Sequence, residues 1–177
     1  MINIVAFIGP SGSGKSTLQQ FLGYAPIVTW TTRQPRAGEE NGKNYYFCRR
    51  EDILQMDSEG QLLEYTEYNG NLYATDLDSI RRVIVAKEHR SIVVDANGVL
   101  ALKRAFGSNS FIIGVHAPCH ECRERLLARG EADIKQRLAT YTAEVEQLKT
   151  LADLVINNAA QNWQKAGEVI RILRAGL

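Results

Sequence analysis

The chain has 177 residues, of which 45% are hydrophobic, and its formal net charge at pH 7 is +1. This length and apolar share suit one α/β domain, and the balanced charge excludes recruitment of nucleic acid or a membrane surface by bulk charge. No apolar run approaches the ~18–20 residues of a spanning helix, and three cysteines make no disulfide framework, so we expect a cytoplasmic protein.

The first motif along the chain is also the sharpest. Residues 9–17 read Gly-Pro-Ser-Gly-Ser-Gly-Lys-Ser-Thr, which fits the phosphate-binding pattern G-x-x-x-x-G-K-[ST]. An apolar run at 2–8 predicts a buried strand before the motif, and 15–22 predicts a helix after it. The glycines let backbone N–H groups turn inward, Lys15 supplies a point charge for the β/γ-phosphates, and Ser16 offers a hydroxyl to Mg²⁺. The predicted ATP-binding residues are Gly9, Ser11, Gly12, Ser13, Gly14, Lys15, Ser16 and Thr17.

The next part of the chain, residues 27–57, predicts short strands with no long helix between them. A strand is predicted at 27–32, a polar loop at 33–44, an aromatic strand at 45–47 and a short helix at 51–57. No long helix separates these strands, so 33–75 is interpreted as a lobe inserted beside the phosphate loop.

A hairpin ends this lobe. Asn69-Gly70 predicts a two-residue type I′ turn between strands at 61–68 and 71–75. Period-2 alternation then separates a polar face from an apolar face. The polar face holds Glu64, Thr66, Tyr68, Asn71, Tyr73 and Thr75, and the apolar face holds Leu63, Tyr65, Leu72 and Ala74. The residues alone leave open whether the polar face grips a ring or is simply solvated.

From Asp76 onwards, strands alternate with helices. Asp76 is predicted to cap a helix that runs to about Glu88, and Pro118 to open a helix that Gly130 ends. This alternation predicts a mainly parallel sheet with helices on both faces. The remaining predictions are strands at 91–95, 111–116 and 153–157, helices at 97–106 and 163–173, and one helical stripe through Ile134, Leu138, Tyr141, Val145, Leu148 and Leu151.

Three further features carry possible chemistry. Arg33 and Arg36 flank a proline, and arginine forks bind phosphate bidentately, although a solvated basic loop is the plainer interpretation. Asp95 ends a buried strand beside the phosphate loop, where it either positions a Mg²⁺-bound water or accepts a hydrogen bond from a substrate amino group. The plainer alternative is a surface cap of the next helix. His116, Cys119 and Cys122 have a spacing found in zinc and redox sites, but no fourth ligand is near them in the sequence and Cys122 falls on an apolar stripe with Leu126, so we favour burial.

Several blocks together resemble guanylate kinases, in order over nearly the whole chain. The Thr-Thr-Arg-Gln-Pro-Arg-Ala-Gly-Glu block and the Glu/Tyr hairpin are the specific parts, because the phosphate loop alone indicates only a superfamily. The blocks are 9–18, 31–39, 41–47, 62–65, 68–73, Asp95 with Gly98-Val99, Arg125-Leu126, Arg129-Gly130, Arg137-Leu138 and Val155-Ile156-Asn157. The chain departs from the family at Trp30, Ala74, Val93 and a short segment between Gly130 and Arg137.

The resemblance implies Mg²⁺-assisted phosphoryl transfer from ATP to GMP, and to dGMP, in purine nucleotide metabolism. Glu64 would accept hydrogen bonds from the guanine N1–H and amino group, and Asp95 would lie near the base and, through a water, the metal that Ser16 holds. The implied GMP site is Thr29, Arg33, Arg36, Tyr45, Glu64, Tyr73, Thr75 and Asp95, and the implied catalytic residues are Lys15, Arg33, Arg125, Arg129 and Arg137, the last three converging from a lid.

The predicted fold is therefore α/β, with a P-loop core, an inserted monophosphate-binding lobe and a short lid. The predicted boundaries are 1–32, 76–117 and 139–177 for the core, 33–75 for the lobe and 118–138 for the lid. We expect a monomer or homodimer that engages small molecules and neither nucleic acid nor membrane. Two alternatives stay open: a related kinase acting on another nucleotide or a phosphorylated sugar, and a non-catalytic guanylate-kinase-like protein-binding domain, which the intact Gly14-Lys15-Ser16 disfavours.

Overall fold

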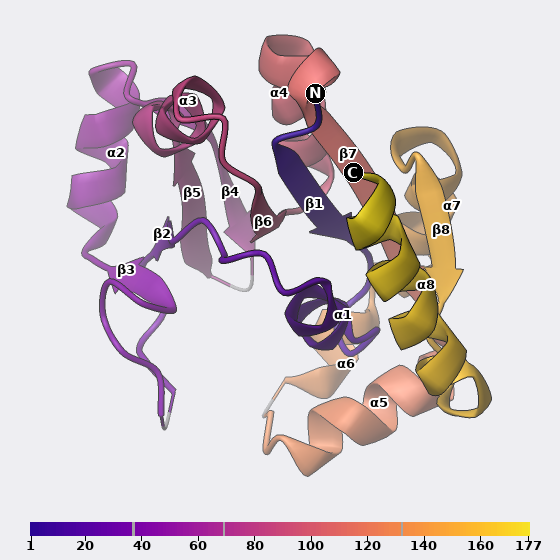
Figure 1. Cartoon of the computed structure of the whole chain (residues 1–177). Helices are drawn as coiled ribbons and strands as arrows, with labels where there is room; N and C mark the ends of the chain where they lie inside the picture. The colour runs from indigo at the N-terminus through magenta and orange to yellow at the C-terminus, as the bar shows by residue number, and fades with distance from the viewer. Residues whose placement is uncertain (37, 69, 132) are drawn as a thin grey trace.

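The structure is a computed structural model that describes residues 1–36, 38–68, 70–131 and 133–177. Two four-stranded sheets organise these residues, one with strand order β6-β1-β7-β8 and the other with order β3-β2-β5-β4. Figure 1 shows the two sheets side by side, each with helices beside it. Within these ranges no helix is both long and apolar enough to cross a membrane.

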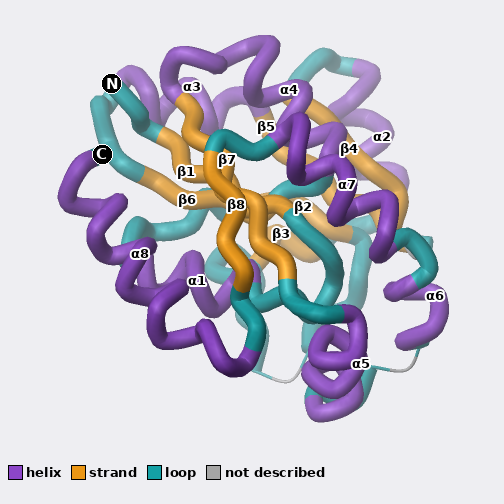
Figure 2. The backbone as a smooth tube through the Cα atoms, turned by 90° about the vertical axis from the view of Figure 1, so that its right-hand side faces the viewer, coloured by secondary structure: helices purple, strands orange, loops and turns teal. Residues whose placement is uncertain are grey.

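The first sheet is the predicted parallel core. Each neighbouring pair of its strands is parallel, which confirms the prediction from alternating strands and helices. The strands are β1 (Ile4–Ile8), β6 (Arg90–Val93), β7 (Ser110–His116) and β8 (Leu154–Asn157). The flanking helices are α1 (Lys15–Leu22) and α8 (Trp163–Gly176) on one face, and α4 (Ala96–Phe106) and α7 (Tyr141–Leu151) on the other (Figure 2).

Strand β1 connects the two halves of the core. Its five residues are all buried, and successive side chains of a strand point to opposite faces. Ile4, Ala6 and Ile8 accordingly pack in one apolar cluster with α4 and α7. Val5 and Phe7 pack in the other cluster, against α1 and α8. The sheet is therefore covered on both faces, and the loop after β1 emerges at its carboxyl edge.

The second sheet forms a small lobe. Its strands are β2 (Thr29–Thr31), β3 (Tyr45–Phe47), β4 (Leu62–Tyr68) and β5 (Asn71–Asp76), and α2 (Arg50–Ser58) packs on it. Ile53 of α2 meets Leu62, Leu72 and Ala74 in a separate apolar cluster. The lobe therefore has a small apolar core of its own.

The second predicted strand lies in this lobe and not in the core. The predicted core segment 1–32 included it, but β2 pairs in parallel with β3 and antiparallel with β5. The residues before β2 join the parallel sheet through an isolated bridge between Pro26 and Ser91 and a hydrogen bond from the Ser91 hydroxyl to the Tyr24 carbonyl. Thr31 donates its hydroxyl to the Leu72 carbonyl at 2.9 Å and so anchors β2 on β5.

The hairpin register is confirmed. Tyr68 faces Asn71, Thr66 faces Tyr73 and Glu64 faces Thr75, while the predicted turn residue Asn69 lies outside the described residues. One assignment to the apolar face is wrong, because a bulge between Leu62 and Glu64 shifts the register. Leu62 therefore packs with Leu72 and Ala74, whereas Leu63 packs against the main core.

Two predicted helices end differently. Helix α3 (Leu77–Val85) stops before Glu88, and Lys87 adopts a left-handed φ of 53°. The stripe from Ile134 to Leu151 is divided into α6 (Ile134–Leu138) and α7, and Tyr141 at the start of α7 donates its hydroxyl to the Ala117 carbonyl at 2.7 Å. The remaining elements are α5 (Cys119–Ala128) and single 3-10 turns at Gly107–Asn109 and Ala160–Asn162.

Candidate active site

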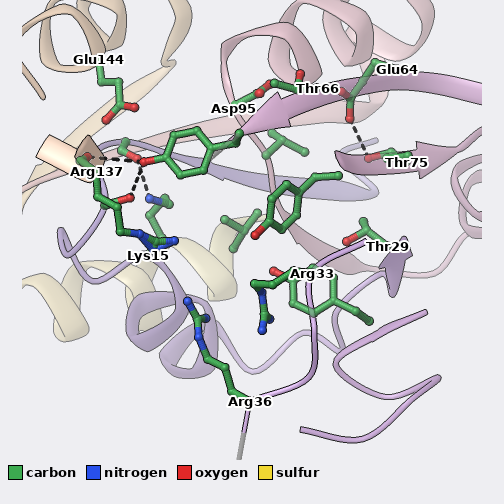
Figure 3. A pocket seen from close by; sticks show the side chains of 18 residues that line it. Lys15, Thr29, Arg33, Arg36, Glu64, Thr66, Thr75, Asp95, Arg137 and Glu144 are labelled. Carbon is green, nitrogen blue, oxygen red and sulfur yellow. Dashed lines mark hydrogen bonds between the residues drawn. The ribbon is translucent and has the colours of Figure 1, made fainter. Parts of the chain in front are cut away.

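A cleft lies between the phosphate loop, the hairpin of the small lobe and the ends of α6 and α7. Figure 3 shows polar side chains from all of these elements pointing into it. The carboxyl ends of β1 and β6 open on the same cleft, the expected position for a ligand in a parallel sheet. Its lining residues are Gly9, Ser11, Lys15, Thr29, Arg33, Arg36, Tyr45, Glu64, Thr66, Tyr68, Tyr73, Ala74, Thr75, Val93, Val94, Asp95, Arg137 and Glu144.

The loop after β1 needs its glycines for close approach as well as for conformation. Gly9, Gly12 and Gly14 all have φ between 80° and 146°, a region that favours glycine. A Cβ on Gly9 would lie 1.9 Å from the Val115 carbonyl oxygen, and one on Gly12 would lie 2.5 Å from the Cys122 carbonyl oxygen. The loop is therefore seated directly on β7 and α5.

Lys15 starts α1 and folds back over the loop. Its ammonium donates to the carbonyls of Gly9 and Pro10, at 2.5 Å and 2.9 Å. Burial lowers the pKa of Lys15 from 10.5 to about 8, and the charge of Glu144 partly opposes that shift. The ammonium is thus held at the cleft by weak carbonyl partners, which a phosphate would replace with charge-assisted bonds.

Arg125 lies behind the loop and not among the cleft-lining residues. It donates to the carbonyls of Gly12 and Ser13 at 3.4 Å, to the Asn158 carbonyl at 2.9 Å and to Glu121 at 2.9 Å. The Asn158 amide also donates to Ser13, at 2.8 Å. These contacts fix the backbone of the loop, a role that the sequence pattern did not suggest.

Glu39 organises the two arginines of the 33–36 loop. Arg33 donates through Nη2 to both Glu39 carboxylate oxygens at 2.9 Å, and the Arg36 main-chain N–H donates to Glu39 at 2.8 Å. The Arg33 guanidinium also lies 5.4 Å from the centre of the Tyr45 ring, whose neighbour Tyr73 is edge-on at 6.1 Å. Arg33 is therefore largely buried and pre-oriented, and not solvated.

The far end of the cleft is carboxylate-rich. Thr75 donates its hydroxyl to Glu64 Oε1 at 2.9 Å. Burial raises the pKa of Glu64 to about 7, and the charge of Asp95 adds to that rise. Asp95 lines the cleft, and its carboxylate also accepts the Gly98 N–H at 3.0 Å. It is therefore both a cleft residue and the cap of α4. A Cβ on Gly98 would meet Val94, which explains the glycine beside this site.

Tyr68 crosses from the hairpin to the phosphate loop. Its hydroxyl lies 2.9 Å from the Ser11 hydroxyl and donates to the Arg137 carbonyl at 3.4 Å. The hairpin thus touches the loop at one end and presents Glu64 at the other. The predicted polar face exists, and all its members except Asn71 line the cleft, with Tyr68 at the phosphate loop and Glu64 at the far end.

Of the three predicted lid arginines, only Arg137 lines the cleft. Its guanidinium lies 5.7 Å from the centre of the Tyr68 ring and donates to Glu131 at 3.2 Å. Arg129 is exposed at the end of α5, although its charge still lowers the pKa of Lys15.

Glu144 is a cleft residue that the sequence analysis missed. Its Oε1 accepts from the Thr140 hydroxyl at 3.0 Å, while the buried Oε2 has no hydrogen-bond partner among the described residues. Burial raises the pKa of this carboxyl. A signal was present, because Glu144 is three residues after Tyr141 and four before Leu148, on their apolar stripe.

The structure brings together most of the predicted site. The residues of that prediction in the cleft lining are Gly9, Ser11, Lys15, Thr29, Arg33, Arg36, Tyr45, Glu64, Tyr73, Thr75, Asp95 and Arg137. Ser16 and Thr17 are exposed at the start of α1, beside Lys15, and Gly12, Ser13 and Gly14 form the loop itself. Cys122 and Leu126 are buried, as the apolar stripe predicted.

The chain is similar to known guanylate kinases in sequence and in fold. A family model described as guanylate kinase matches residues 1–166. A guanylate kinase of Lactobacillus delbrueckii is 34% identical, covering 90% of this chain and 82% of its own, and one of Desulfitobacterium hafniense is 36% identical, covering 88% and 82%. A solved guanylate kinase of Anaplasma phagocytophilum superposes with a TM-score of 0.76 at 23% identity, covering 99% of this chain and 85% of its own.

Proposed function

This chain belongs to the guanylate kinase family, and we propose that its cleft transfers the γ-phosphoryl group of ATP to GMP or dGMP. A phosphate oxygen of GMP forms the new bond to the γ-phosphorus, and the bond from that phosphorus to the β,γ-bridging oxygen of ATP breaks. ADP and GDP leave. The attacking oxygen is already ionised, so the reaction needs positioning and charge neutralisation but no general base.

One observation carries the proposal: a phosphate loop with its lysine faces a paired Glu64 and Thr75 across a single cleft. Glu64 would accept two parallel hydrogen bonds from the guanine N1–H and amino group, with Thr29 and Thr75 at the edge of the base. Arg33, Arg36, Tyr45 and Tyr73 would hold the GMP phosphate between the base and the loop. The contact of Arg33 with Glu39 supports this role, because it fixes the guanidinium before substrate arrives.

Residues 9–17 would bind the ATP phosphates through inward N–H groups, and Lys15 would neutralise the transferring group. Arg137 would add charge from the lid side. Ser16 and Asp95 offer hard oxygen donors next to the loop, the ligand chemistry that Mg²⁺ prefers with several retained waters. When bound, Mg²⁺ would neutralise phosphate charge, and Ser16 directly and Asp95 through water are the residues of this chain that would hold it.

A coupled assay of ADP release would test the substrate. GMP and dGMP should be the preferred acceptors among the nucleoside monophosphates, and sugar phosphates should give background turnover. Equal turnover with a sugar phosphate would favour the related-kinase alternative. The absence of turnover with every acceptor, in a folded protein, would favour the protein-binding alternative.

Guanosine binding should strengthen as the pH rises through the pKa of Glu64. That pKa is about 7, and only the ionised carboxylate can accept both guanine N–H groups. We expect affinity to increase about tenfold between about pH 6 and about pH 8. Calorimetry with guanosine is the measurement, since the phosphate of GMP itself titrates near this range. The Glu64→Gln variant should show no such slope, and a slope that persists in it would assign the titration to another group.

Arg137 and Arg125 should give opposite kinetic signatures. Arg137→Ala removes cleft charge, so we expect kcat to fall at least roughly tenfold with a smaller change in KM. Arg125→Ala removes bonds to the loop backbone, so the KM for ATP should rise and the Tm should fall. Steady-state kinetics with thermal denaturation would measure both, with exposed Arg123→Ala as the matched control. If Arg137→Ala kept kcat within about twofold of the unaltered enzyme, the lid role would fail.

A further inference from the structure

Glu131 joins the small lobe to the lid through two arginines. Its Oε1 accepts from Arg36 Nη2 of the small lobe, and its Oε2 accepts from Arg137 Nη1 of the lid at 3.2 Å. Each oxygen of one carboxylate therefore serves a different lobe. We call this arrangement the Arg36–Glu131–Arg137 bridge.

The bridge is more enclosed than an ordinary surface ion pair. The Glu131 and Arg137 side chains are 16% and 14% exposed, while Arg36 is 47% exposed. Ion pairs in full solvent contribute little, but enclosure and two hydrogen bonds from charged donors strengthen this one. Tyr68 reinforces the same junction, because its hydroxyl contacts both Ser11 and the Arg137 carbonyl.

Both arginines line the cleft in which the proposed reaction occurs. Arg33, the other arginine of the loop, is already held by Glu39, a residue of its own lobe. Arg36 is instead held by an anion from the opposite side of the cleft. A substrate phosphate and the Glu131 carboxylate therefore present the same chemistry to Arg36, and they compete for its Nη2 donor.

We infer that Glu131 is a positioning residue that acts as a stand-in anion: it holds Arg36 and Arg137 together across the cleft, and the GMP phosphate displaces it from Arg36. This inference rests on the proposed function, because it requires GMP as the ligand. The bridge keeps two cationic groups close before substrate binds, at the expense of GMP affinity. Loss of the carboxylate should thus tighten phosphate binding and free the lid.

Calorimetric titration of Glu131→Gln with GMP and with guanosine, both without ATP, tests the competition. The Kd for GMP should fall roughly three- to tenfold, while the Kd for guanosine should stay within about twofold, since guanosine lacks the competing phosphate. Glu124→Gln is the control, because Glu124 is exposed on α5 and its change removes the same charge. An unchanged or weaker GMP affinity in folded Glu131→Gln, or an equal gain for guanosine, would overturn the inference.

Limited trypsin digestion of the ligand-free enzyme tests the same bridge through the rate at which the lid is cleaved. Cleavage after the exposed Arg129 and Lys135 should accelerate several-fold in Glu131→Gln and equally in Arg36→Gln, because either change breaks the link between the lobes. Unaltered rates in both variants would contradict the bridge. The proposed function is judged separately, by GMP binding and turnover of the unaltered enzyme. If both are present while the variants match that enzyme, only the bridge fails.

Discussion

Replacing Lys15 with methionine should lower turnover by at least about a thousandfold, the scale of a cation that stabilises a transferring phosphoryl group, while GMP still binds. In the proposed arrangement the Lys15 ammonium contacts the ATP phosphates and the transferring group. It does not belong to the GMP site. Methionine is of similar length, so the cleft should keep its shape. Steady-state kinetics and calorimetry with GMP measure the two halves of this prediction.

The variant should also remain folded. Burial lowers the pKa of Lys15 to about 8, so its charged form is less favourable in the folded chain than in the unfolded chain. A lowered lysine pKa costs stability below the folded pKa, and this cost disappears as the pH rises from about 8 toward 10.5. A neutral side chain removes the cost, so Tm near neutral pH should not fall. Lys43→Met is the matched control, because Lys43 is 70% exposed and pairs only with Glu40 among the described residues. A folded Lys15→Met that had lost GMP affinity would show that the division of the cleft is wrong.

Replacing Glu64 with alanine should destroy the preference for GMP over AMP. The carboxylate accepts two guanine N–H groups, and adenine offers no such pair. Each guanine donor left unpaired costs about 1–3 kcal/mol, so the ratio of kcat/KM for GMP to that for AMP should fall at least about thirtyfold. Activity on both nucleotides in the coupled assay gives this ratio directly.

Glu67→Ala is the control for that change, since Glu67 lies on the same strand but is exposed and paired with Arg50. The loss of Glu64 also removes the acceptor of the buried Thr75 hydroxyl, so thermal denaturation should accompany the kinetics. Guanine selection would be reassigned to other residues if the substrate ratio of Glu64→Ala matched that of the unaltered enzyme.

Local sequence patterns predicted those features whose conformation depends on residues close in the sequence. The glycine spacing at 9–14 predicted the phosphate loop because only that backbone turns its N–H groups inward. The Asn69-Gly70 dipeptide and the period of two predicted which hairpin residues face one another, and the pairing of Glu64 with Thr75 followed. The bulge was not predicted, because an extra residue in a strand depends on which core takes Leu62 and which takes Leu63.

The short strand β2 was misplaced for a related reason. The segment 27–32 is apolar enough for either sheet, and its choice depends on partners that lie far along the chain. Thr31 bonds to Leu72, and the backbone pairs with Tyr73 and Ala74. No pattern within 27–32 carries information about a strand that begins some forty residues later.

By itself, then, the sequence determined the alternation that builds the parallel sheet, the phosphate loop, the hairpin face that carries Glu64, and the family. The tertiary structure alone decided which charged groups meet. Glu131 joins Arg36 across 95 positions of sequence, and Arg125 reaches the Gly12 carbonyl across 113. Glu144 shares the cleft with Lys15 because the first turn of α7 lies beside the loop. Long, flexible charged side chains fit many surroundings equally well, so their partners are set by the packing of the apolar elements that carry them.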